Sequence, residues 1–293
     1  EPGPGKITLL RDADGDGEAE FRTTFAKGLD RPHGLAIQGG YLYVGTPRQI
    51  VRFAYRAGQE RAASPPQAVT APGALGDGQG HSTRNLAFSS DGVTLFISVG
   101  SRGNTAVEAA PRATVQALDL AERSLRTVAA GLRNPVGVVV HPDTAEVYVV
   151  VNERDGLGDG LVPDYLTHLE TGAFYGWPYA YIGANPDPQF GTVKPDLVAL
   201  TRVPDVLFQA HSAPLGLVIY DAQQFPASYR GDAFVALHGS WNAAAPVGYM
   251  VVRVPFGDGR PLGHYESFAT GFWVAGQQSA RVIGRPAGLA VAA

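Results

Sequence analysis

The chain has 293 residues, with 23 Lys and Arg against 27 Asp and Glu, which gives a formal net charge of −4. This slightly acidic balance argues against a nucleic-acid-binding surface, and a 45% share of hydrophobic residues excludes a disordered chain. No apolar run approaches the roughly 18 residues that a membrane helix needs, so we expect no membrane span. Cysteine is absent, which excludes disulfides, zinc–thiolate sites and thiol nucleophiles.

The first predicted strand spans residues 5–10 and is followed by an acidic loop. Asp12, Asp14, Asp16 and Glu20 place oxygen ligands in the pattern of a Ca²⁺-binding loop, with glycines that permit the turn. An EF-hand loop would need a glutamate at its twelfth position, where this sequence has threonine. A hairpin-type structural Ca²⁺ site and a metal-free turn therefore both stay open.

A phrase of the form Pro-x-Gly followed by apolar residues recurs along the chain. The copies are RPHGLA, HSTRNLA, RNPVGV, SAPLGL and GRPAGL, of which the second is degenerate. The glycine of each copy, or the asparagine that replaces it, stands at position 34, 85, 137, 216 or 288. The intervals of 51, 52, 79 and 72 residues resemble a propeller blade period of about 40–50 residues with insertions in the last two.

Strand-like segments follow these phrases, and no segment of 12 or more residues has a sustained helical period. The segments are residues 41–44, 50–53, 95–99, 146–150, 234–237 and 249–254. We therefore predict a single all-β domain over residues 1–293, a β-propeller with four-stranded antiparallel blades. A β-sandwich is the alternative, but it would not explain the repeated phrase. Residues 5–10 resemble a late blade strand and residues 285–293 a first strand, so one terminal blade would be incomplete.

His81 follows a glycine-rich turn directly before a predicted inner strand. Glycines let a backbone approach a ligand closely, and a neutral histidine is the usual general base near pH 7. A lone histidine is more often structural, and the same holds for His211 and His238 taken singly. The three stand at the ends of inner strands from different blades, so they would converge on one axis, which favours a functional site.

The densest polar segment spans residues 152–164 and directly follows a predicted buried strand, which places it at one mouth of the ring. Its five ionisable side chains could chelate a hard cation or bind an anion, or they could form a solvated turn. Residues 174–181 contain five aromatics, which suit a planar ligand or a sugar, although core packing could also account for them. Hydrolase and nucleotide-binding motifs are absent from the sequence.

Eight segments together carry a resemblance to a known family. They are LRNPVG at 132–137, VNERDG at 151–156, HGSWN at 238–242, and residues 80–86, 172–179, 210–217, 252–256 and 284–289. With them the chain resembles the soluble pyrroloquinoline quinone (PQQ)-dependent sugar dehydrogenases, in particular the sorbosone dehydrogenase-like (aldose sugar dehydrogenase) branch. The resemblance covers nearly the whole chain and implies a six-bladed propeller.

The resemblance also implies the roles of individual residues. PQQ would lie flat at the mouth of the central channel and chelate Ca²⁺, whose protein ligands correspond to the backbone carbonyls of Arg154 and Asp155. His81 corresponds to the catalytic base, Arg133 to the arginine beside the quinone C5 oxygen, and Asn134 to the asparagine that hydrogen-bonds the quinone. The further cofactor-binding residues that it implies are Arg84, His211, His238, Trp241 and Arg253. Because the implied metal ligands are carbonyls, we expect the Arg154 side chain to be dispensable for Ca²⁺ binding.

The implied activity is PQQ- and Ca²⁺-dependent oxidation of an aldose or a sorbosone-like sugar at C1, with hydride transfer to the quinone. An external acceptor, a small quinone or a cytochrome, would reoxidise the cofactor, and the family implies a periplasmic or secreted protein. Two positions differ from the family pattern, Ala243 for arginine and Met250 for lysine, and both remove positive charge that could meet the PQQ carboxylates. The alternatives are a cofactor-free propeller that binds a glycan or a protein, and a calcium-dependent lactonase, for which no carboxylate ring is evident.

Overall fold

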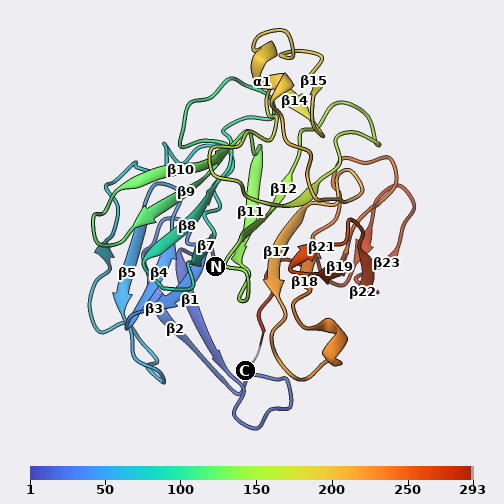
Figure 1. Cartoon of the computed structure of the whole chain (residues 1–293). Helices are drawn as coiled ribbons and strands as arrows, with labels where there is room; N and C mark the ends of the chain where they lie inside the picture. Colours follow the sequence, from blue (N-terminus) through green and yellow to red (C-terminus); the bar gives the residue numbers. More distant parts are fainter. Residues whose placement is uncertain (292–293) are drawn as a thin grey trace.

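The computed structural model describes residues 1–291, which form antiparallel sheets with almost no helix (Figure 1). Four sheets have four strands each. The first contains β3 (Leu35–Gln38), β4 (Tyr41–Gly45), β5 (Ile50–Ala54) and β6 (Gln67–Ala68). The second contains β7 (Leu86–Phe88), β8 (Thr94–Val99), β9 (Thr114–Asp119) and β10 (Leu125–Ala130). The third contains β11 (Asn134–Val140), β12 (Val147–Asn152), β13 (Tyr165–His168) and β16 (Val206–Leu207). The fourth contains β17 (Pro214–Ile219), β18 (Ala233–Leu237), β19 (Met250–Val254) and β22 (Glu266–Ala269).

The remaining strands form two-stranded sheets. They pair β1 (Lys6–Arg11) with β2 (Phe21–Lys27), β14 (Ala180–Tyr181) with β15 (Asn185–Pro186), β20 (Phe256–Gly257) with β21 (Arg260–Pro261), and β23 (Trp273–Ala275) with β24 (Arg281–Val282). The helical elements are α1 (Pro195–Ala199) and the 3₁₀ turn Ala227–Tyr229. Within residues 1–291, no helix is long and apolar enough to cross a membrane.

The four-stranded sheets follow one another in sequence order across the molecule and pack face to face (Figure 1). β12 shows the consequence, because its residues Val147–Val151 are all buried between the neighbouring sheets. Val149 and Val151 pack toward the second sheet, and Tyr148 and Val150 pack toward the fourth. Both faces of such a strand are covered, so its sequence is continuously apolar rather than alternating. The strands predicted between residues 41 and 254 and the all-β propeller architecture are confirmed, with four complete blades in the described chain.

The recurring phrase has a steric explanation at the propeller axis. Each complete blade begins with a phrase, and its glycine lies against the backbone of the next phrase. A Cβ on Gly34 or Gly216 would clash with the carbonyl oxygen of Arg84 or Ala287, and a Cβ on Gly137 would lie 2.7 Å from that of Leu215. In the degenerate copy, the Asn85 amide instead donates to the Val136 carbonyl oxygen at 2.8 Å.

The first strands surround an axial cavity of about 520 Å³. Residues 287–290 complete its lining beside β17, although residues 285–291 form no paired strand, and the end of the strand predicted over 285–293 lies outside the described residues. Leu215 also borders a second cavity at one mouth of the channel. The fold thus brings the phrase ends of several blades to one place.

Candidate functional site

The cavity at the channel mouth has a volume of about 370 Å³, which suits a small ligand. Seven site residues predicted from the sequence line it, whereas Arg154, the other implied metal ligand, does not. The seven are His81, Arg133, Asn134, Asp155, His211, His238 and Trp241. The structure therefore brings the three histidines together, but from two blades rather than three, because His81 precedes β7 of the second blade whereas His211 precedes β17 and His238 follows β18 of the fourth.

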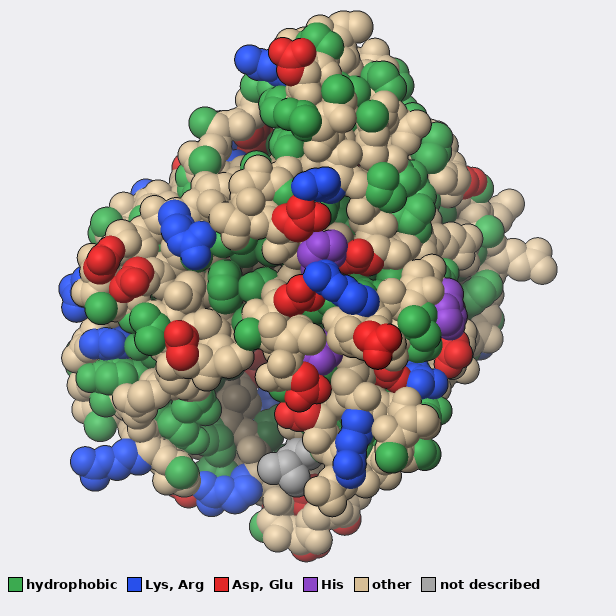
Figure 2. Space-filling model, in the orientation of Figure 1, with side chains coloured by type: hydrophobic (Ala, Val, Ile, Leu, Met, Phe, Trp, Pro, Cys, Tyr) green, Lys and Arg blue, Asp and Glu red, His purple; other side chains and the backbone are tan. Residues whose placement is uncertain are grey.

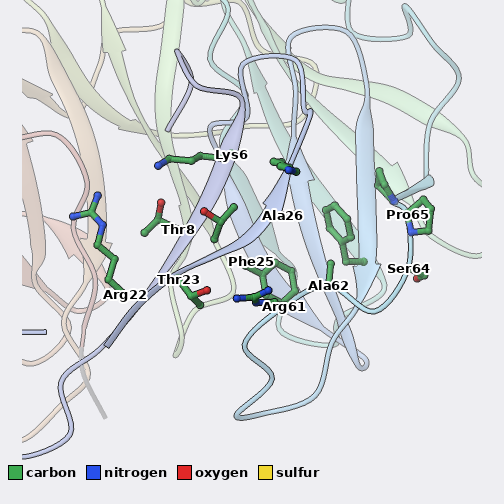
Figure 3. Close-up of a pocket in the computed structure, with 14 residues that line it drawn as sticks. Lys6, Thr8, Arg22, Thr23, Phe25, Ala26, Arg61, Ala62, Ser64 and Pro65 are labelled. Atoms are coloured by element: carbon green, nitrogen blue, oxygen red, sulfur yellow. The ribbon is translucent and has the colours of Figure 1, made fainter. Parts of the chain in front are cut away.

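A larger hollow of about 780 Å³ lies beside the β1–β2 hairpin (Figure 3). Lys6, Thr8 and Arg22 of the hairpin and Arg61 of the β5–β6 connection are among its lining residues. None of the predicted site residues lines this hollow. Acidic and basic side chains are interspersed over the face seen in Figure 2, with no continuous basic surface.

His81 is held by Ser101, which lies in the loop after β8. The His81 Nδ1 atom lies 2.9 Å from the Ser101 carbonyl oxygen and 3.0 Å from its Oγ atom. A carbonyl oxygen can only accept a hydrogen bond, so this contact favours the proton on Nδ1 and leaves a lone pair on Nε2. Burial and the charge of Arg133 lower the pKa of His81 to about 4. His81 is therefore neutral at pH 7 and able to accept a proton. The turn before it requires Gly80, where φ is +66° and a Cβ would clash with the Arg102 carbonyl.

Arg133 places a positive charge beside this base. Its side chain is buried, and Nη1 donates to the carbonyl oxygen of Glu153 at 2.7 Å. Nη2 lies 3.5 Å from the Asp155 carboxylate. Burial lowers the pKa of Arg133, and the Asp155 carboxylate opposes that shift. The guanidinium therefore stays charged and fixed in orientation.

Asn134, the first residue of β11, offers an unused polar atom to the cavity. Its Oδ1 atom is buried and has no hydrogen-bond partner among the described residues. Gly100 makes room for this amide, because a Cβ there would clash with it. Buried polar atoms are nearly always paired, so a ligand that bound here would satisfy Asn134.

The predicted metal loop is tightly organised around Asp155. Its backbone carbonyl, one of the two implied Ca²⁺ ligands, accepts from Asn104 Nδ2 at 3.0 Å and from Arg154 Nε at 3.2 Å. The Asp155 carboxylate accepts from Asn242 at 2.7 Å and lies 3.4 Å from His211 Nδ1. The side chain of Asp155, as well as its backbone, therefore belongs to the cavity.

The Arg154 side chain forms an ion pair with Asp187, whose side chain is only 2% exposed. Removing Arg154 would leave that carboxylate buried without its cation, which is costly. This contact speaks against the expectation that the Arg154 side chain is dispensable.

Two further acids of the loop line the cavity, although the sequence assigned them no individual role. Glu153 and Asp164 are both buried, and burial raises the pKa of each carboxyl above its usual range. The Asp164 carboxylate accepts from the backbone N–H of Glu153 and of Ala213, each at 2.8 Å. Asp164 thereby ties the loop to the start of the fourth blade.

The opposite wall comes from the fourth blade and the fifth phrase. His211 is buried with a left-handed φ of 66°, and its Nε2 atom lies 3.0 Å from the Gly158 carbonyl oxygen. His238 Nδ1 lies 2.9 Å from the carbonyl oxygen of Pro286. The Trp241 ring is 80% exposed at the rim.

Arg285 also lines the cavity and was missed by the sequence reasoning. Its guanidinium donates to the carbonyl oxygens of His238 and Gly239. The available signal was the fifth phrase itself, in which arginine precedes proline as it does in the first copy. Arg285 supplies positive charge at the mouth, whereas neither Ala243 nor Met250, the two positions that differ from the family pattern, lines the cavity.

Two predicted cofactor ligands do not line this cavity. Arg84 is fully buried, and its guanidinium donates to the carbonyl oxygens of Leu75, His81 and Thr83. Arg253 lies on β19, where it pairs with Asp232 at 2.6 Å. Both therefore serve the framework in this structure, and we correct their assignment as cofactor ligands.

Two other predicted features lie away from the cavity. The carboxylates of Asp12, Asp14, Asp16 and Glu20 converge to within 4.8 Å of one another, and all four residues are exposed. A structural Ca²⁺ ion at this loop stays a prediction. In the aromatic segment, Tyr175, Trp177 and Tyr179 are buried, so core packing accounts for these rings.

The fold and this mouth define a β-propeller of the kind found in sugar dehydrogenases. The chain belongs to the TrAA12-like family, whose model matches residues 3–162 and 198–292. The glucose/sorbosone dehydrogenase family model matches residues 116–240. The chain is also 32% identical over 197 residues to an uncharacterized protein of Borreliella burgdorferi, covering 66% of this chain and 52% of that protein. The chain thus spans about half the length of this curated relative.

Solved structures share the architecture at low sequence identity. The PQQ domain of pyranose dehydrogenase from Coprinopsis cinerea, in its holo form, has a TM-score of 0.78 at 19% identity, covering 98% of this chain and 83% of that one. The family AA12 enzyme of Trichoderma reesei has a TM-score of 0.76 at 21% identity, covering 99% and 84%. The PQQ-bound aldose sugar dehydrogenase of Streptomyces coelicolor has a TM-score of 0.67 at 17% identity, covering 98% and 79%. At these identities the likeness shows the fold.

The residues at the mouth fit a planar, anionic cofactor bound together with a hard cation. Arg133 and Arg285 offer positive charge to carboxylates, and the Asn134 amide has an unsatisfied atom. The carboxyl groups of Glu153, Asp155 and Asp164 in the 152–164 loop line the cavity and offer the oxygen ligands that Ca²⁺ prefers.

Proposed function

We propose that this protein is a PQQ- and Ca²⁺-dependent sugar dehydrogenase that oxidises an aldose or a sorbosone-like sugar at C1. The observation that carries the proposal is a neutral His81 held by Ser101 and placed beside Arg133 at the channel mouth. Membership of the TrAA12-like family and the match to the glucose/sorbosone dehydrogenase model support the same chemistry.

In this proposal, each wall of the cavity has a separate task. Arg133, Asn134, His238 and Arg285 hold the cofactor, and the carbonyls of the 152–164 loop face its metal. Trp241, exposed at the rim, offers a flat surface to the incoming sugar.

The bound cofactor would supply a quinone carbonyl that accepts hydride from sugar C1. His81 Nε2 takes the proton of the C1 hydroxyl, and Ser101 keeps the other ring proton on Nδ1 during that transfer. Arg133 would stabilise the negative charge that hydride transfer places on the quinone oxygen, an electrostatic effect that needs no rearrangement because the guanidinium is already fixed. The product is a lactone from an aldose or an acid from an aldehyde.

We also propose the wider context that the family resemblance implies. The chain forms a single propeller domain in which a complete ring would have six blades. An external small quinone or cytochrome accepts the electrons, and the protein works in the periplasm or outside the cell.

Reconstitution tests the proposal directly. The apo-protein is titrated with PQQ with and without Ca²⁺, and dye reduction is then measured with a panel of aldoses and sorbosone. We expect a Ca²⁺-dependent quinone absorbance and sugar-dependent dye reduction. Binding of a glycan without either signal would identify the cofactor-free alternative and overturn the proposal.

A further inference from the structure

Asn104 lies between β8 and β9 and contacts two parts of the site at once. Its Oδ1 atom accepts from Arg133 Nη2 at 3.0 Å and from the backbone N–H of Asp155 at 2.9 Å. Its Nδ2 atom donates to the Asp155 carbonyl oxygen at 3.0 Å. Its own carbonyl oxygen accepts from Arg133 Nε at 3.2 Å and from the Trp177 indole at 2.9 Å. One residue thus makes five hydrogen bonds to groups that come from other segments.

The geometry of these bonds restricts the metal loop. The Asn104 amide pairs with both the N–H and the C=O of Asp155, which defines the position and the tilt of that residue's backbone. An implied metal-facing carbonyl of the loop belongs to this same residue. A shift of Asn104 would therefore move Asp155 directly.

The same residue restricts Arg133. Two of the guanidinium nitrogens, Nε and Nη2, donate to the two oxygens of Asn104. The third nitrogen, Nη1, donates to the Glu153 carbonyl. The planar guanidinium group is thereby held in a single orientation relative to the loop, as expected when all three of its nitrogens donate hydrogen bonds.

The loop that carries Asn104 is itself ordered from within. The Glu108 carboxylate accepts from the backbone N–H groups of Arg102 at 2.8 Å and Gly103 at 3.0 Å. Ser101 of the same loop holds the His81 ring. A single segment, residues 101–108, therefore contacts the base, the arginine and the metal loop.

We propose that Asn104 is a positioning residue that fixes the Asp155 backbone and the Arg133 guanidinium relative to each other. This inference deepens the proposed function and depends on it for its catalytic consequence. The structural part, in which Asn104 holds Asp155 and Arg133, holds independently of any cofactor.

Hydrogen exchange of the apo-protein tests the structural part. In Asn104→Ala, we expect the Asp155 amide to exchange about 10-fold faster than in wild type, because its acceptor is lost. Asn104→Asp keeps that acceptor oxygen and should restore most of the protection. Thr105→Ala, the neighbouring change in the same loop, is the matched control and should leave exchange unchanged. Unchanged Asp155 exchange in Asn104→Ala, or equal loss of protection in the Asp and Ala variants, would overturn the proposal.

Cofactor titration tests the consequence. Loss of a residue that orients a ligand-binding group typically costs about 10–100-fold in affinity. We expect the Kd for PQQ, measured by quinone absorbance with Ca²⁺ present at a temperature where both proteins are folded, to rise by about that factor in Asn104→Ala. A wild-type chain that binds no PQQ would refute the proposed function, whereas the exchange experiment would still decide the role of Asn104. Wild-type affinity in Asn104→Ala would refute its role at the site.

Discussion

His81 illustrates how a single residue obtains its chemistry from its surroundings. The Nδ1 atom hydrogen-bonds the Ser101 carbonyl oxygen, so the reactive lone pair is on Nε2. Burial and Arg133 together keep the ring neutral. Arg133 therefore has two effects, since the charge that would stabilise a developing anion also lowers the pKa of the base.

His81→Ala should lower kcat by about 10²–10⁴-fold, the usual contribution of a positioned general base. Binding of PQQ and the melting temperature should stay close to wild type, because the side chain makes its hydrogen bonds only to Ser101. Steady-state dye reduction and quinone absorbance measure the two quantities. His264→Ala, a change at an exposed histidine, is the control. Activity of His81→Ala within a few-fold of wild type would remove this residue from the mechanism.

The lowered pKa of His81 predicts the pH profile. The base works only when neutral, so it is active above its pKa and is lost as the pH falls through about 4 rather than through its usual value of 6.5. We expect the loss of kcat/KM that protonation of His81 causes, measured with the reconstituted enzyme, to centre near pH 4. Burial raises the pKa of Glu153 and of Asp164 in the same cavity to about 7, so Glu153→Gln is measured as well. An acidic limb near pH 6.5 that is the same in both proteins would contradict the assignment of a buried, neutral His81.

At the scale of the element, the 152–164 loop depends on side chains as much as on its carbonyls. Arg154→Ala should destabilise the protein by about 3–5 kcal/mol, because it leaves the buried Asp187 carboxylate without its cation, and should weaken Ca²⁺-dependent PQQ binding. Arg202→Ala is a matched control, since that arginine is 54% exposed in its pair with Glu170 and surface pairs contribute about 0–1 kcal/mol. Denaturant unfolding compares the two. Equal losses in the free energy of unfolding for the two variants would show that the Arg154–Asp187 pair contributes no more than an exposed pair.

The phrase glycines offer a second test of an element, the inner strand. Gly34→Ala should destabilise the fold by about 1–3 kcal/mol, because the new methyl group meets the Arg84 carbonyl and the inner strands must separate. Gly288→Ala changes the equivalent glycine of the fifth phrase, where no atom lies within 4 Å of the added group. Thermal unfolding of the two variants should therefore differ, and equal melting temperatures would contradict the steric explanation.

For the molecule as a whole, the sequence predicted the features that depend on local residue patterns, namely the strands and their radial repetition. The apolar run at 147–151 predicted a buried strand, and the recurring phrase predicted the radial architecture. The ion pair of Arg154 with Asp187 and the contacts of Asn104 were not predictable, because their partners are distant in the sequence and belong to irregular loops. Arg84 shows the opposite error, since it stands within a matching motif but turns inward to backbone carbonyls.

Calcium removal tests the whole assembly of cofactor, loop and propeller. If the 152–164 loop holds Ca²⁺ that is linked to PQQ, the EDTA-treated protein should lose PQQ binding, and Ca²⁺ at 100 times its Kd should restore it and stabilise the fold by about 2.7 kcal/mol. The acidic loop near the N-terminus is a second predicted calcium site, and Asp14→Ala separates the two because it removes one converging carboxylate there. This variant should keep Ca²⁺-dependent PQQ binding, measured by quinone absorbance, and lose only the stabilisation that the acidic loop provides. An EDTA-treated wild-type protein that binds PQQ and oxidises sugar as well as the Ca²⁺-loaded form would refute a metal at the mouth.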